Sequence, residues 1–142
     1  MNMIQRAMKK DNGPNPYVAN VSQEAMMNDD YRTTFWTGDM AQMTLMSIPV
    51  DSDIGLEIHK DTDQIIRIEH GMGQVKMGDH KEQLDYQLDV RRGDVIFVPA
   101  GTWHNVVNIG RMSLKVSVIY APPHHLRGTI HKTKKEAIKK LP

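Results

Sequence analysis

The sequence of 142 residues contains no cysteine. Disulfide bonds, thiolate metal sites and cysteine nucleophiles are therefore excluded. The sequence also lacks an excess of one charge, because 18 lysines and arginines stand against 17 aspartates and glutamates. A balanced charge gives no electrostatic reason to expect a nucleic acid or a membrane surface as the main partner.

Long hydrophobic runs are absent as well. No stretch approaches the roughly 18 apolar residues of a membrane span, and the opening segment MNMIQRAMKK carries no apolar run. We therefore expect a cytoplasmic protein. A chain of 142 residues is long enough to bury a core and is expected to form one domain.

The pattern of turn residues and apolar runs predicts three parts of the chain. Residues 1–30 contain Asn-Gly-Pro-Asn-Pro and no sustained periodicity, which predicts an extended arm with one helical turn near Ser22 to Met27. Residues 31–121 contain short apolar runs separated by turn signals, which favours an antiparallel β-sandwich or barrel. Residues 122–142 are expected to form a lid segment and a short helix, whose Thr133 and Glu136 have capping-box spacing.

The apolar runs predict which polar side chains face the interior. We expect strands at 31–37, 40–48, 54–60, 63–70, 74–78, 82–89, 94–99, 103–108 and 111–120. Side chains two residues apart share a face of a strand, so Glu57 and His59 point the same way. The charges of Arg67 and Glu69 mark an outward face, which turns Gln64 inward. The last strand is expected to turn Met112, Leu114, Val116, Val118 and Tyr120 inward and Lys115 outward.

An apolar interior is thus interrupted by one carboxylate, two imidazoles and one carboxamide. The side chains are those of Glu57, His59, Gln64 and His104. A buried lone carboxylate is costly, and a shared metal ion is the simplest way to offset that cost. Asp63 competes with Gln64 for the inward position if a β-bulge changes the register.

The segment GDVIFVPAGTWHNVVN, residues 93–108, resembles the second motif of the cupin family, G-x5-P-x-G-x2-H-x3-N. All five anchor residues have the family's spacing, with His104 at the metal-ligand position. In the first cupin motif, His59 and Gly71 keep their places, whereas Glu57 replaces a histidine and Gln64 replaces the usual glutamate. The resemblance covers about residues 31–121 and is similar to the phosphomannose-isomerase-like, cupin-2 type.

This resemblance implies a double-stranded β-helix, the jelly-roll barrel of cupins, with one divalent transition metal. Iron, manganese, zinc and nickel stay open, with Glu57, His59, Gln64 and His104 as ligands. Two histidines and one carboxylate are also the donor set of non-haem iron oxygenases. A set of Gln, His, Glu and His resembles the zinc ligands of type I phosphomannose isomerases.

Two reaction types follow, and neither is favoured by the resemblance alone. One is dioxygen-dependent oxidation of an enol or diketone-like molecule, and the other is isomerisation of a sugar or sugar phosphate. Glu57 and Tyr120 are the catalytic candidates. Arg67 and Lys115 are expected to face outward, so no inward cation is predicted for a phosphate group. The alternative is a small-molecule-binding cupin without catalysis, with or without metal.

Two features concern neighbouring segments and partners. Tyr120, His124, His125 and His131 lie close in sequence beside stiffening prolines, and this segment is expected either to cover one end of the barrel or to contact a partner. We predict a homodimer, because the outward apolar side chains need cover. These side chains are Trp36, Leu56, Ile58 and Ile65.

Overall fold

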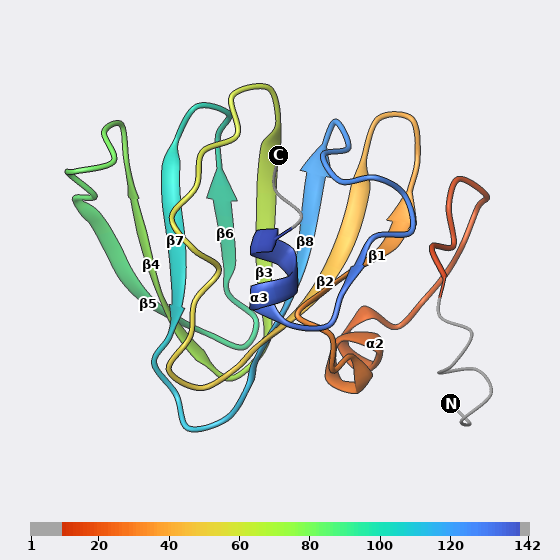
Figure 1. The fold of residues 1–142 in the computed structure, drawn as a ribbon, viewed down its shortest axis with the longest axis horizontal. Coiled ribbons are helices and arrows are strands. Elements are labelled where there is room, and N and C mark those ends of the chain that lie inside the picture. The colour runs from red at the N-terminus through yellow and green to blue at the C-terminus, as the bar shows by residue number, and fades with distance from the viewer. Residues whose placement is uncertain (1–9, 140–142) are drawn as a thin grey trace.

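The computed structural model describes residues 10–139 and consists of two antiparallel β-sheets with two short helices (Figure 1). One sheet has the strand order β6-β3-β8-β2-β1-β9, and the other has the order β5-β4-β7. The all-β architecture with a short C-terminal helix is confirmed. The elements are α2 (Val21–Met27), β1 (Arg32–Thr37), β2 (Gln42–Ile48), β3 (Asp63–His70), β4 (Met72–Gly78), β5 (Tyr86–Arg91), β6 (Val95–Val98), β7 (Trp103–Asn108), β8 (Leu114–Ala121), β9 (Ile130–His131) and α3 (Lys134–Lys139).

The strand register determines which side chains face the core. In the neighbouring strands β2, β8 and β3, the residues Gln42, Tyr120 and Gln64 are directly opposed. Directly opposed residues share a face of a sheet, so these three side chains point into the space between the sheets. Hydrophobic side chains fill the rest of that space, each contributing roughly 1.5–3 kcal/mol. They include Met46, Ile48, Ile66, Ile68, Val75, Val98, Val106, Leu114, Val116 and Val118.

The predicted strand at 54–60 is wrong as a regular strand. Isolated bridges join Asp53 to Val107 and Glu57 to His104, so this segment runs along the edge of β7 without forming a continuous ladder. Gly55 has a φ of +96°, which interrupts the extended backbone. Paired backbone hydrogen bonds of 3.0 Å in both directions nevertheless hold Glu57 opposite His104.

Two other differences arise at strand ends. β9 has only two residues, which is too short for an alternating pattern to reveal, and it pairs with Arg32 and Thr33 of β1. Met112, expected to face inward, is 58% exposed because β8 begins only at Leu114. The inward positions of Leu114 and Tyr120 on the same strand are as expected, since both are buried.

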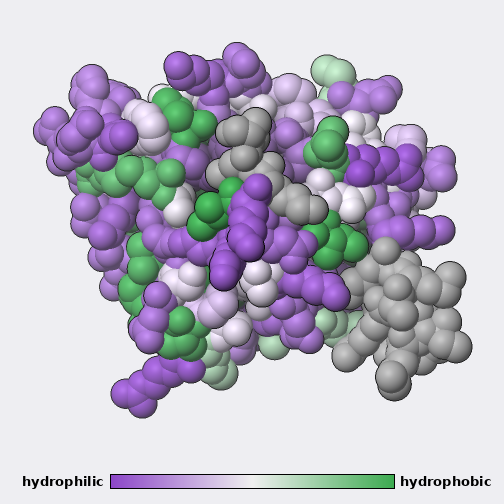
Figure 2. Space-filling view, in the orientation of Figure 1, coloured by the Kyte–Doolittle hydropathy of each residue, from purple (hydrophilic) through white to green (hydrophobic). Residues whose placement is uncertain are grey.

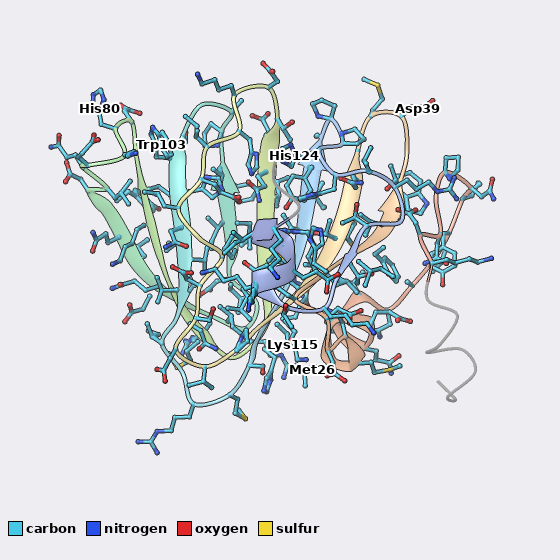
Figure 3. The ribbon with its side chains drawn as sticks, viewed as in Figure 1. Met26, Asp39, His80, Trp103, Lys115 and His124 are labelled. Atoms are coloured by element: carbon cyan, nitrogen blue, oxygen red, sulfur yellow. The ribbon has the colours of Figure 1, made fainter. Side chains whose placement is uncertain are left out.

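Part of the outer face of the six-stranded sheet is covered by α2. Glu69 and Lys115, expected to face outward, are both buried beneath this helix. Ser22 Oγ donates to Glu69 Oε1 at 3.1 Å, and Lys115 Nζ donates to the Asn28 carbonyl at 2.6 Å. Figure 3 shows Lys115 at the α2 end of the sandwich. The alternation of side chains along the strands therefore correctly placed Glu69 and Lys115 on the outer face of the sheet. It did not predict that α2 would cover them.

The described part of the arm is fastened to β1 by backbone and carboxylate contacts. Asn12 N donates to the Phe35 carbonyl at 2.9 Å, and the Asp11 carboxylate accepts from the backbone N–H groups of Gly13 and Thr37 and from the Thr37 hydroxyl. A Cβ at Gly13 would lie 2.1 Å from the Thr37 carbonyl oxygen, so only glycine permits this close approach.

Asp11 makes the stability of this contact depend on pH. Burial would raise its pKa, but hydrogen bonds from Thr37 and Gly13 lower the pKa below the ordinary 3.8. The ionised carboxylate therefore stabilises the fold above about pH 4, and this contribution is lost as the pH falls further. We expect the wild type to be more stable than Asp11→Asn near pH 7 and the difference to shrink towards pH 3, as measured by urea unfolding. A difference that does not change with pH would contradict this.

The surface shows no single feature that decides the state of association. The face that carries α3 is largely hydrophilic, with hydrophobic residues scattered over it (Figure 2). Leu56 is 42% exposed, while Trp36, Ile58 and Ile65 are half-buried. The homodimer stays a prediction, and light scattering should give twice the chain mass of 16.2 kDa. Within residues 10–139, no helix is long and apolar enough to cross a membrane.

Candidate metal centre

Three potential metal ligands meet where segment 53–59 lies beside β7. Glu57 Oε1 is 3.2 Å from His59 Nε2 and 3.5 Å from His104 Nε2. One ligand atom from each of the three residues lies within 4.8 Å of the others. A group of two imidazoles and one carboxylate at these separations could hold a metal ion.

The turn before β7 orients both histidines. Gly101 has a φ of +83°, which favours glycine, and its N–H donates to the His59 carbonyl at 2.8 Å. His104 Nδ1 lies 3.0 Å from the Thr102 carbonyl, which holds Nδ1 as the donor and leaves Nε2 directed towards Glu57, where it could bind a cation in place of a proton. A second hydrogen bond of this kind is the usual way to fix the tautomer of a metal-binding histidine.

The structure places Gln64 inward and Asp63 outward. Gln64 is 2% exposed and lies opposite Tyr120. Asp63 is exposed, and its Oδ1 accepts from the Ala100 N–H at 2.9 Å. The irregularity of β3 lies between Ile68 and His70, too late in the strand to change the register at Gln64.

The missing hydrogen bonds of the predicted ligands give a second reason, besides their residue types, to expect a metal ion. Each of the four predicted ligands has one buried side-chain atom without a hydrogen-bond partner among the described residues. The atoms are Glu57 Oε1, His59 Nε2, Gln64 Oε1 and His104 Nε2. Each unsatisfied buried polar atom costs roughly 1–3 kcal/mol, and a shared cation would satisfy the three atoms of Glu57, His59 and His104 that lie within 4.8 Å of one another.

The local electrostatics keep Glu57 ionised. Burial alone would raise its pKa, but contacts with His104 and His59 outweigh burial and lower the pKa far below its ordinary value. An ionised carboxylate between two imidazole nitrogens is the state that binds a cation.

Tyr120 stands beside this centre as a neutral phenol. Burial raises its pKa to about 12, against the opposing effect of the Arg32 charge. Its ring centroid is 6.0 Å from that of His59, and its hydroxyl is 3.3 Å from His125 Nε2. The side chain can therefore hold a proton close to the donor cluster.

The histidine-rich segment after β8 folds over the same end of the barrel. The His124 ring is 4.2 Å from the His59 ring, and the His125 ring is 5.1 Å from the Tyr120 ring. Figure 3 shows His124 at the end of the sandwich opposite Lys115. His131 lies on β9 opposite Arg32 and is not part of the segment that covers this end of the barrel.

Gln42 fastens that segment from within the barrel. Its Oε1 accepts from the N–H groups of His124 and His125 at 3.1 and 2.9 Å, and its Nε2 donates to the His125 carbonyl at 2.8 Å. Gln42 is 1% exposed, so water does not compete for these bonds. One buried amide thereby sets the position of both imidazoles.

Gln42→Ala is expected to loosen the segment without unfolding the barrel. Since about 1 kcal/mol is lost per hydrogen bond, amide hydrogen exchange at His124 and His125 should accelerate roughly tenfold or more. Gln87→Ala, which removes only a bond to the nearby Leu84 carbonyl, is the control. Unchanged protection at both histidines would show that other contacts hold the segment.

Two buried polar residues near the centre were not predicted. Arg32 is 7% exposed and Thr44 is fully buried. Arg32 was hidden by its place at the start of a strand, where a charged residue is ordinarily assigned to the surface. The only weak signal was that Arg32 and Thr34 are two residues apart and so share a face of β1. Thr34 lies opposite Thr44, and both face the interior. The sequence-based prediction of an interior without a cation is wrong.

Comparison with known proteins agrees with this geometry. The cupin domain model, Cupin_2, matches residues 44–120, more than half of the chain. The chain is a cupin. This cupin is 51% identical to YrkC of Bacillus subtilis over 129 residues, covering 91% of the chain and 69% of YrkC. It is 40% identical to L612 of Acanthamoeba polyphaga mimivirus over 115 residues, covering 80% of the chain and 70% of L612.

A solved structure resembles this cupin over nearly its full length. The crystal structure of BH2720 from Bacillus halodurans has a TM-score of 0.91 and 49% sequence identity, covering 92% of this cupin and 99% of that chain. The names of these three relatives state no activity. The comparisons therefore establish the family and the fold of this cupin, and its chemistry must be argued from the site.

Proposed function

We propose that this cupin is a metal-dependent enzyme that oxidises a small oxygen-bearing molecule with dioxygen. The supporting observation is the set of four buried donor atoms without hydrogen-bond partners among the described residues, on Glu57, His59, Gln64 and His104. One divalent transition metal, with iron first, fits two imidazoles, one carboxylate and one amide oxygen. We place this activity on a small molecule in the cytoplasm, and the balanced charge of the chain gives no reason to expect a nucleic acid as the partner instead.

The lining of the barrel favours oxidation over sugar isomerisation. A sugar presents hydroxyl groups on every side, and each needs a polar partner when it is buried. The inward side chains of β3 and β6 next to Gln64 are instead apolar, as seen at Ile66 and Val98. A small, largely planar enol or diketone-like molecule needs fewer polar partners.

The residues in and beside the centre have different roles in this proposal. When bound, the metal would bind the oxygen atoms of the substrate and supply the redox chemistry. Glu57 supplies the only negative charge of the donor set and His104 is held in the ligating tautomer. The Tyr120 hydroxyl holds a proton for a substrate oxygen, and the segment carrying His124 and His125 limits the entry of water.

Metal analysis of untagged protein by mass spectrometry tests the first part. We expect about one equivalent of a transition metal in the wild type and in His80→Ala, and almost none in His104→Ala. His80 is exposed at the tip of the β4–β5 hairpin, remote from the centre (Figure 3). Metal retained in His104→Ala, or no metal in the wild type, would refute the site.

Dioxygen consumption tests the second part. Iron(II)-loaded protein would be screened with 1,3-diketones and enolisable 2-oxo acids, with loss of each compound followed in parallel. We expect stoichiometric uptake of dioxygen for at least one compound, abolished in His104→Ala and retained in His80→Ala. Stable metal binding without any uptake would favour a binding protein that uses the same centre.

A further inference from the structure

A second cluster of unpartnered polar atoms lies in the barrel, outside the four donors. Arg32 is 7% exposed, and its Nε has no hydrogen-bond partner among residues 10–139. Its guanidinium lies 5.4 Å from the centre of the Tyr31 ring, a cation–π contact that offsets only part of the cost of burying the charge. Within the described residues, no carboxylate lies at ion-pair distance from this guanidinium.

Thr44 presents a second unsatisfied atom on the same wall. Its side chain is fully buried, and its Oγ1 has no hydrogen-bond partner among the described residues. Arg32 and Thr34 share a face of β1 by parity, and Thr34 lies opposite Thr44. The guanidinium and the hydroxyl therefore project into the same interior space. The guanidinium can only donate and the hydroxyl can donate as well as accept, so an anion placed beside both would accept from each of them.

Tyr120 connects this wall with the metal centre. Its phenol interacts with both Arg32 and Thr44, and its ring centroid is 6.0 Å from that of His59. The charge of Arg32 also reaches His125, where burial and then this charge lower the pKa of the imidazole to about 3. Tyr120 and His125 thus carry no negative charge, and Glu57, whose charge also acts on both of them, is not at ion-pair distance from the guanidinium.

We propose that Arg32, Thr44 and the Tyr120 hydroxyl bind the carboxylate of a small organic acid whose other oxygen atoms face the metal centre. This inference rests on the proposed function and narrows its substrate class to enolisable carboxylates. The planar guanidinium fork matches a carboxylate, and a charge-assisted bond from a buried arginine is among the stronger hydrogen bonds in proteins. One carboxylate neutralises one guanidinium, and the second carboxylate of a molecule such as malonate would reach towards the metal centre, whereas phosphate carries all of its charge on one small tetrahedral group that cannot span both places.

Calorimetric titration with malonate, inorganic phosphate and the neutral malonamide tests the proposal. We expect zinc-loaded wild type to bind malonate, phosphate at least tenfold more weakly, and malonamide not measurably. Arg32→Gln should weaken malonate binding at least tenfold, while the exposed Arg67→Gln, with 52% of its side chain accessible, should bind as the wild type does. Equal malonate binding by Arg32→Gln and wild type, equal binding of malonamide, or no malonate binding by the wild type would overturn it.

The same titration with metal-free protein separates this inference from the proposed function. Arg32-dependent malonate binding without metal would support the carboxylate site even if the metal analysis fails. Folding of the variant is not expected to confuse the result, because Arg32→Gln removes an uncompensated buried charge and should melt at a higher temperature than wild type. Arg32→Lys keeps the charge without the fork and should also lose at least tenfold in malonate affinity, and wild-type affinity in this variant would refute recognition by the fork.

Discussion

Glu57→Gln should lower the affinity for a divalent transition metal by more than the roughly 10–100-fold that loss of an outer-shell partner costs. The substitution keeps the size of the side chain and removes the single negative charge of the four-donor set. Glu57 is ionised between His59 and His104 and is the one negatively charged side chain among the four predicted ligands. Without it, no ligand of this set offsets the charge of the cation. Competition with a fluorescent chelator would measure the change.

The matched control is Glu82→Gln, an exposed carboxylate on the β4–β5 hairpin. It should bind metal as the wild type does. The metal-free Glu57→Gln protein should still fold, as circular dichroism would check, since the substitution leaves the shape of the side chain unchanged. Wild-type metal affinity in Glu57→Gln would mean that the carboxylate is not a ligand and that the histidines act with Gln64 alone.

Asn108→Ala is expected to destabilise the fold by about 3 kcal/mol or more without directly affecting the metal ligands. The Asn108 amide donates to the carbonyls of Ile48, Pro49 and Met112, and its Oδ1 accepts from the Gly110 N–H. The residue is 4% exposed, so these groups lose a partner that water replaces poorly. The estimate follows from roughly 1 kcal/mol per lost bond. Urea unfolding measures the change.

Asn15→Ala, on the exposed part of the arm, is the control and should change the free energy of unfolding by less than about 0.5 kcal/mol. Asn108 is the last anchor of the motif at residues 93–108, and these contacts show that it serves the loop joining β7 to β8. A loss of stability comparable to the control would mean that the loop closes without the amide.

The second cupin motif was the most informative part of the sequence. Its spacing, together with strand parity, predicted that His104, Glu57 and His59 point towards one place, and the structure brings the three together. This worked although 54–60 is not a regular strand, because the backbone pair between Glu57 and His104 preserves the alternation locally. The inward position of Gln64 followed from the outward charge of Arg67.

Contacts between distant segments could not be predicted in this way. Whether Glu69 is exposed depends on where α2 docks, and docking depends on hydrogen bonds across 47 residues of sequence. The position of His124 depends on Gln42, 82 residues earlier. Arg32 was missed because burial of a guanidinium depends on the surrounding wall, not on its own strand pattern. The hydrophobic periodicity of a sequence describes one helix or strand at a time, so it cannot predict contacts between distant segments.

The two edges of β1 pair with strands from distant parts of the sequence. β2, which follows β1 directly in the sequence, pairs with one edge, whereas β9, at Ile130–His131, pairs with the other edge about 100 residues later in the sequence. The ion pair of 3.9 Å between Asp11 and Arg127 joins the arm to this late segment. During synthesis on the ribosome, β1 therefore cannot be paired on both edges before Ile130 and His131 have been made. Chaperone contact with nascent chains of this cupin should accordingly persist until residue 131 has left the exit tunnel.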